Sequence, residues 1–68
     1  MNVVIFDTSK NSWHHINKGI SWINYNDLKK AVSHFDKALN LEPDNLVAQL
    51  HKGMTLYKLD RIDEAGLF

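Results

Sequence analysis

The sequence predicts an all-α fold of about three full helices and a truncated fourth, preceded by an extended N-terminal arm. Three observations lead to this prediction. Apolar residues recur at steps of three and four from Trp13 onward, which is the period of a helix face. Pro43 interrupts the pattern, and Asp44-Asn45 is well suited to starting another helix. An offset of 34 residues brings similar residues into register, which indicates helix–turn–helix repeats.

Length and composition limit the classes of protein to which the chain can belong. Its 68 residues allow one domain at most, and a hydrophobic fraction of 44% is enough for a core. A domain of this size usually needs a disulfide, a metal or a partner subunit, and the chain has no cysteine. The absence of cysteine fits a reducing compartment.

Charge and hydropathy argue against two kinds of partner. Eight basic residues balance eight acidic ones and no basic run occurs, so neither nucleic acid nor an anionic membrane is an expected partner. The longest apolar run, Val3 to Phe6, is too short to span a bilayer. We therefore expect a soluble protein of cytoplasmic localisation.

Residues 1–11 form the predicted arm. Val3-Val4-Ile5 is a β-branched run that favours extended backbone over helix. A frayed terminus is the alternative to an ordered arm.

The first predicted helix starts at Ser12, a suitable N-cap, and ends near the polar stretch Asn24 to Asp27. Its apolar face consists of Trp13, Ile16, Ile20 and Ile23. The second helix is predicted over Leu28 to Leu41, with Asp27 as its N-cap and Pro43 beyond its end.

The third predicted helix starts after Asp44 or Asn45. One of its faces carries Leu46, Val47, Leu50, Met54 and Tyr57. A break is expected in the stretch "LDRID", after which Ile62 to Phe68 would form the truncated fourth helix.

Three pairs of similar residues define the internal repeat. Lys18-Gly19 and Lys52-Gly53 are 34 residues apart, as are Leu28 and Ile62, and Ala31 and Ala65. A helix–turn–helix unit of this period is typical of tetratricopeptide repeats.

The chain resembles the tetratricopeptide family in the residues that carry its pattern, W-x2-L-G-x2-Y, then A-x3-F, then P. The matching positions are Gly19, Trp22, Ala31, Phe35, Ala38 and Pro43. His15 and Lys18 depart from the family's tryptophan and leucine. The resemblance implies a short right-handed α-solenoid, with one repeat over residues 12–45 and a partial second repeat over residues 46–68.

Glycine inside a helix costs about 1 kcal/mol relative to alanine, so Gly19 and Gly53 need a compensating role. We expect the paired helix to approach each glycine closely, through the small residues Ala31 and Ala65 respectively. Phe35 and Trp22 would then fill the space between successive layers.

No motif for catalysis or metal binding is evident. A helical metal site needs histidines four residues apart, and His14, His15, His34 and His51 form no such pair. There is also no phosphate-binding glycine loop and no activated nucleophile. We expect a protein that is not an enzyme and has no cofactor. A metal- or nucleic-acid-binding protein is the least favoured alternative.

The resemblance also implies a binding site, because the first helix of each tetratricopeptide repeat lines a concave groove for a peptide or partner segment. The corresponding positions in this chain are Trp13, Ile16, Asn17, Ile20, Ile23, Asn24, Val47, Leu50, His51, Met54, Tyr57 and Lys58. This groove would be apolar with polar edges. The N-terminal arm, a second copy of the chain, or a foreign helix or extended peptide could cover it.

The partial second repeat indicates self-association, since repeat arrays usually need about three repeats and a polar capping helix. The exposed apolar end of the stack would consist of Leu56, Leu59, Ile62, Leu67 and Phe68. We expect a homo-oligomer, most simply a two-fold dimer. Two alternatives stay open, namely a purely structural self-assembling unit and a fragment of a longer repeat array without a foreign ligand.

Overall fold

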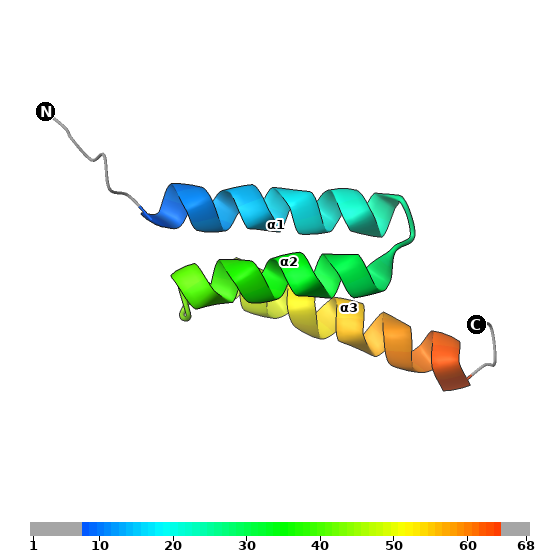
Figure 1. Cartoon of the computed structure of the whole chain (residues 1–68). Helices are drawn as coiled ribbons and strands as arrows, with labels where there is room; N and C mark the ends of the chain where they lie inside the picture. Colours follow the sequence, from blue (N-terminus) through cyan, green and yellow to red (C-terminus); the bar gives the residue numbers. More distant parts are fainter. Residues whose placement is uncertain (1–7, 65–68) are drawn as a thin grey trace, which may run out of the picture.

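The computed structural model describes residues 8–64, and the side chains of residues 11–61. Within this range the chain forms three α-helices and no strand: α1 (Thr8–Asn24), α2 (Leu28–Leu41) and α3 (Leu46–Glu64). As Figure 1 shows, α2 runs antiparallel to α1 and lies between α1 and α3, which touch each other only slightly. The predicted all-α class is confirmed for the described residues.

The start of α1 differs from the prediction. The helix begins at Thr8, so residues 8–11 of the predicted arm are helical, and Ser12 lies inside the helix as a buried residue. The hydroxyl of Ser12 bonds to a neighbouring helix end, described below, and is not the cap of its own helix. Residues 1–7 lie outside the described residues, and so does the β-branched run on which the arm was predicted.

The bounds of α2 agree with the prediction. Asp27 is its N-cap, with a side-chain oxygen that accepts a hydrogen bond from the Lys30 N–H at 3.2 Å. At the other end the Glu42 N–H donates to the carbonyl of Ala38 at 2.9 Å, after which Pro43 cannot continue the helix. In the turn before α2, Asn26 has a φ of 63°, a left-handed conformation that asparagine tolerates better than most residues.

The predicted break near the C-terminus is absent. α3 continues without interruption through Asp60 and Arg61 to Glu64, so no separate fourth helix starts at Ile62. The stretch contains neither glycine nor proline, and both Asp60 and Arg61 are exposed, where charged residues are tolerated in a helix. Residues 65–68 lie outside the described residues.

The core lies where α2 contacts both of its neighbours. Its fully buried apolar residues are Ile16, Ala31, Phe35, Ala38 and Ala48. Phe35 is the largest of them, and a Cβ added to Gly19 would lie only 2.5 Å from its ring carbon Cε1. The close neighbour of Gly19 is therefore the Phe35 ring, whereas the sequence predicted Ala31. Gly53, in contrast, has nothing within 4 Å of the position where its Cβ would stand.

A polar joint connects the three helices at the α2–α3 turn. The Ser12 hydroxyl donates to Glu42 Oε1 at 2.8 Å, and Asn45 Nδ2 donates to the same oxygen at 2.9 Å. Asn45 Oδ1 also accepts from the N–H groups of Val47 and Ala48, both at 3.0 Å, which makes Asn45 the N-cap of α3. The position at which α3 begins is thus fixed by three residues: Ser12 of α1, Glu42 at the C-cap of α2 and Asn45 in the turn.

Candidate interaction surfaces

Part of the predicted groove belongs to the core. Ile16 has no exposed surface, so a ligand cannot contact it in this arrangement. Ile20, Ile23 and Val47 are half-buried and pack against the core. His51 is half-buried as well, and its ring stacks on Phe35 with a centroid separation of 5.5 Å. These five side chains hold the helices together.

The other predicted groove residues are exposed. They are Trp13, Asn17, Asn24, Leu50, Met54, Tyr57 and Lys58. Predicted groove residues from two helices meet in a hollow of about 300 Å³, which Ile23 at the end of α1 lines with Tyr57 and Lys58 of α3. Asn26, Leu28 and Arg61 complete its walls.

An exposed row of apolar side chains lies on α3. We call it the α3 stripe, and it consists of Leu46, Leu50, Met54 and Tyr57, which are 75%, 61%, 46% and 61% exposed. The opposite side of the helix holds the buried residues Ala48 and Thr55, and the Thr55 hydroxyl donates to the carbonyl of His51 at 2.7 Å. The helix therefore packs on the hairpin through Ala48, Thr55, Val47 and the His51 ring, and it turns the four apolar side chains of the stripe outward.

Gly53 shapes the surface of the α3 stripe. With no side chain at this position, an open hollow of about 510 Å³ forms, lined by Gln49, Leu50, Gly53, Met54, Tyr57 and Lys58. The repeat pattern had indicated a close helix neighbour at Gly53, and none lies there among the described residues. Four of the six lining residues were predicted groove residues.

The predicted self-association end is only partly described. Leu56 is exposed and Leu59 is half-buried. The side chain of Ile62 lies outside the described residues, as do Leu67 and Phe68. This surface stays a prediction.

A second surface, which the sequence did not indicate, lies along the junction of α1 and α2. The rings of His15 and His34 stack there with centroids 5.8 Å apart, and His14 contacts His15 edge-on at 5.3 Å. The Nδ1 atoms of His15 and His34 are shielded and have no hydrogen-bond partner among the described residues. Burial, followed by nearby positive charge, lowers the pKa of both imidazoles.

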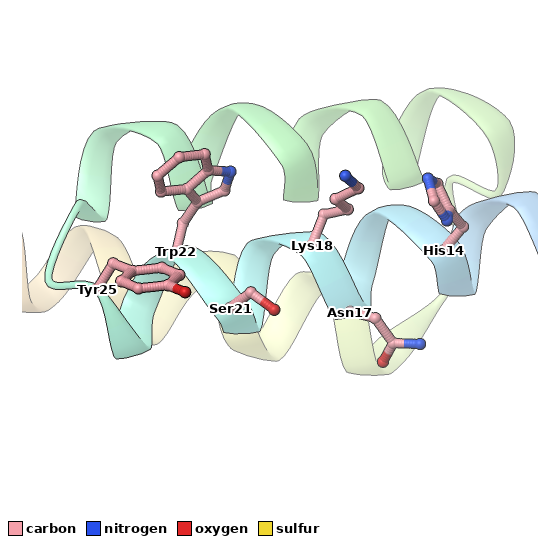
Figure 2. A pocket seen from close by; sticks show the side chains of 6 residues that line it. All are labelled: His14, Asn17, Lys18, Ser21, Trp22 and Tyr25. Atoms are coloured by element: carbon pink, nitrogen blue, oxygen red, sulfur yellow. The ribbon is translucent and has the colours of Figure 1, made fainter.

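Next to these histidines, α1 carries an open hollow of about 400 Å³, shown in Figure 2. Its walls are His14, Asn17, Lys18, Ser21, Trp22 and Tyr25. The Lys30 ammonium of α2 lies 4.4 Å from the centroid of the Trp22 ring, a cation–π contact between the two helices.

Among the residues that the structure describes, no group of three or more histidine, cysteine or acidic side chains could hold a metal ion. None of the described helices combines the length and apolarity that crossing a bilayer requires.

Comparison with family models, with curated proteins and with solved structures finds no significant match to this chain.

Proposed function

We propose that the chain is a non-catalytic protein–protein interaction module of the tetratricopeptide type, which binds an amphipathic helix along the α3 stripe. In this proposal α1 and α2 form one helix–turn–helix repeat and α3 begins the next, as in a short right-handed solenoid. The 34-residue period of the sequence and the antiparallel packing of successive helices in Figure 1 support this assignment.

The exposure of the α3 stripe is the observation that carries the proposal. Four large apolar side chains stand on one helix face, and all are close to half exposed or more. Burying one such side chain is worth about 1.5–3 kcal/mol, so covering the stripe would supply much of the free energy of an association. Contiguous apolar surface of this kind marks interaction sites in soluble proteins.

The spacing of the stripe favours a helix as the ligand. Leu46 and Tyr57 are eleven positions apart, or about 16 Å along the helix axis, which matches about three turns of a partner helix. Gly53 leaves bare backbone between Leu50 and Tyr57, where a side chain of the partner can enter. Such an arrangement is typical of helix-in-groove recognition.

A second copy of the chain supplies a suitable apolar helix face in its own α3 stripe. We therefore expect self-association, with the two stripes face to face around a two-fold axis. A purely structural self-assembling unit, without any foreign ligand, is the second candidate function, and the same stripe supports it.

Sedimentation equilibrium at micromolar concentration tests the proposal. The wild type is expected to form dimers, and Leu50→Asp and Met54→Asp are each expected to yield a folded monomer, because a carboxylate cannot be buried in an apolar interface without a partner. Leu41→Asp is the matched control: it changes an apolar residue that is 40% exposed, at the end of α2, and should leave the dimer intact. Far-UV circular dichroism verifies that each variant is helical.

Titration with a fluorescent synthetic amphipathic helix, with leucines at alternating steps of three and four, separates the two candidates. Binding by the wild type that is lost in Leu50→Asp supports an interaction module, and self-association without peptide binding supports a structural unit. Leu56→Asp tests the other predicted surface, because loss of the dimer in this variant alone would place the contact at the chain end. A wild type that neither dimerises nor binds the peptide would contradict the proposal.

A further inference from the structure

The junction of α1 and α2 collects positive charge from both helices. We call this surface the basic seam, and it consists of His14, His15, Lys18, Lys30, His34 and Lys37. Two contacts tie it across the helices, the His15–His34 stack and the Lys30 ammonium on the Trp22 ring. The imidazoles of the two helices are thus held side by side, and Lys30 of α2 is held against α1.

No acidic side chain neutralises the basic seam among the described residues. The ion pair that the described residues form lies outside the seam: it joins Lys52 of α3 to Asp36 of α2 at 2.6 Å. The charges that lower the pKa of His15 and His34 come from other basic residues, Lys37 of α2 and Lys18 and His14 of α1, with none from α3. An uncompensated cluster of cations attracts an anionic ligand.

An aromatic hollow adjoins these cations on α1. Figure 2 shows Trp22, Lys18 and His14 pointing to the same side of the helix, and Tyr25 standing beside Trp22. The rings of Trp22 and Tyr25 are 5.9 Å apart and tilted by 57°, which leaves apolar ring surface at one end of the row of charges. A ligand for this surface needs carboxylates along its length and an apolar side chain at one end.

We propose that the basic seam binds a short acidic peptide segment, with carboxylates on Lys18 and Lys37 and an apolar side chain against Trp22 and Tyr25. His14 and Trp22 are eight residues apart on α1, or about 12 Å, which is the length of three to four extended peptide residues. A peptide is favoured over nucleic acid because the chain as a whole carries no net charge, and a polyanion longer than the seam would meet its acidic residues. This site is separate from the α3 stripe and does not depend on the function proposed for it.

Fluorescence anisotropy with the labelled peptide Glu-Asp-Leu-Glu-Asp tests the proposal, with Gln-Asn-Leu-Gln-Asn as the uncharged comparison. The acidic peptide should bind at low salt and dissociate as salt is raised, and the uncharged one should not bind. Protonation of His15 and His34 adds positive charge to the seam, so affinity for the acidic peptide should rise as the pH falls below neutral.

Paired variants locate the site. Lys18→Gln with Lys37→Gln should weaken binding by about fivefold to tenfold, since each exposed ion pair contributes up to about 1 kcal/mol. Lys58→Gln with Arg61→Gln removes the same charge from α3 and should change the affinity by less than about twofold, the effect of distant screened charges. Tyr25→Ser, at a side chain that is 77% exposed, should weaken binding without altering the thermal unfolding curve.

Three results would overturn the proposal: equal binding of the uncharged peptide, an equal loss of affinity in the α3 control pair, or no binding of the acidic peptide at low salt. A single-stranded oligonucleotide that binds the seam more tightly than the acidic peptide would identify nucleic acid as the ligand class and would likewise refute the peptide assignment.

Discussion

The α1–α2 hairpin and α3 place their apolar side chains in opposite ways. In the hairpin, Ile16 and Phe35 have no exposed surface, and lysines such as Lys18 and Lys37 face solvent. In α3, the buried residues are Ala48 and Thr55, and the large apolar ones form the exposed stripe. α3 therefore attaches to the hairpin by small side chains, by Val47 and the His51 ring, by the polar joint and by the Lys52–Asp36 ion pair, and its larger apolar side chains stay exposed.

This comparison predicts its largest effect at Phe35. Phe35→Ala is expected to destabilise the fold by about 3–5 kcal/mol, because it removes the side chain that contacts both Gly19 and His51. Leu50→Ala, its counterpart on the α3 stripe, should change the free energy of unfolding of the monomer by no more than about 0.5 kcal/mol. Urea unfolding followed by circular dichroism measures both.

A domain of this size is marginally stable, so Phe35→Ala is expected to populate the unfolded state strongly. Phe35→Leu, with an expected cost of about 1–2 kcal/mol, keeps the comparison measurable. Similar costs for Phe35→Leu and Leu50→Ala in dilute, monomeric protein would show that the two helix faces do not differ as described.

The two glycines sharpen the comparison, because the same substitution should have opposite signs. Gly19→Ala places a Cβ 2.5 Å from the Phe35 ring and should destabilise the protein by about 1–3 kcal/mol. Gly53→Ala meets no atom within 4 Å and should stabilise α3 by about 0.5–1 kcal/mol through helix propensity. Thermal unfolding of both variants at matched concentration measures the two effects. Shifts of the unfolding midpoint in the same direction would contradict the predicted opposite signs.

The polar joint should contribute less than the core. Asn45→Ala removes the cap of α3 and the bond to Glu42, with an expected cost of about 1–2 kcal/mol. Asp27→Ala removes the more exposed cap of α2, which bonds one N–H, and should cost about 0.5–1 kcal/mol. Urea midpoints give the two values. Equal costs would indicate that Asn45 acts only as a cap and that its bond to Glu42 adds nothing.

The local features of the fold could be predicted from the sequence, and the non-local ones could not. The bounds of α2 follow from Asp27 and Pro43, whose effects act within one turn of the helix. The role of Ser12 depends on Glu42, 30 residues away, so its position resembled a helix start. Neither glycine nor proline occurs between Leu59 and Glu64, so the helix continues there, although its polar residues are also typical of a turn.

The candidate surfaces show the same limit. Helical spacing placed Ile16 and Leu50 on the apolar faces of their helices, but which apolar face is covered depends on the neighbouring helix. Ile16 is in the core and Leu50 is exposed for this reason. The contact between His15 and His34 joins different helices, and no spacing along the chain indicates it.

The smallest effect on stability is expected from the pH dependence of the stacked histidines, His15 and His34, in the hairpin. Burial and the charges of Lys37 and Lys18 hold the pKa of His15 and His34 below the ordinary value of 6.5. Below pH 6.5 the unfolded chain therefore binds more protons than the folded chain. The free energy of unfolding is highest above pH 6.5 and decreases as the pH falls toward the folded pKa. The urea midpoint should fall over the same window. His15→Gln combined with His34→Gln should flatten the dependence, and Lys37→Gln should reduce it, since removing this charge raises the folded pKa toward 6.5. A double histidine variant with the pH dependence of the wild type would assign the loss of stability to groups outside the α1–α2 junction.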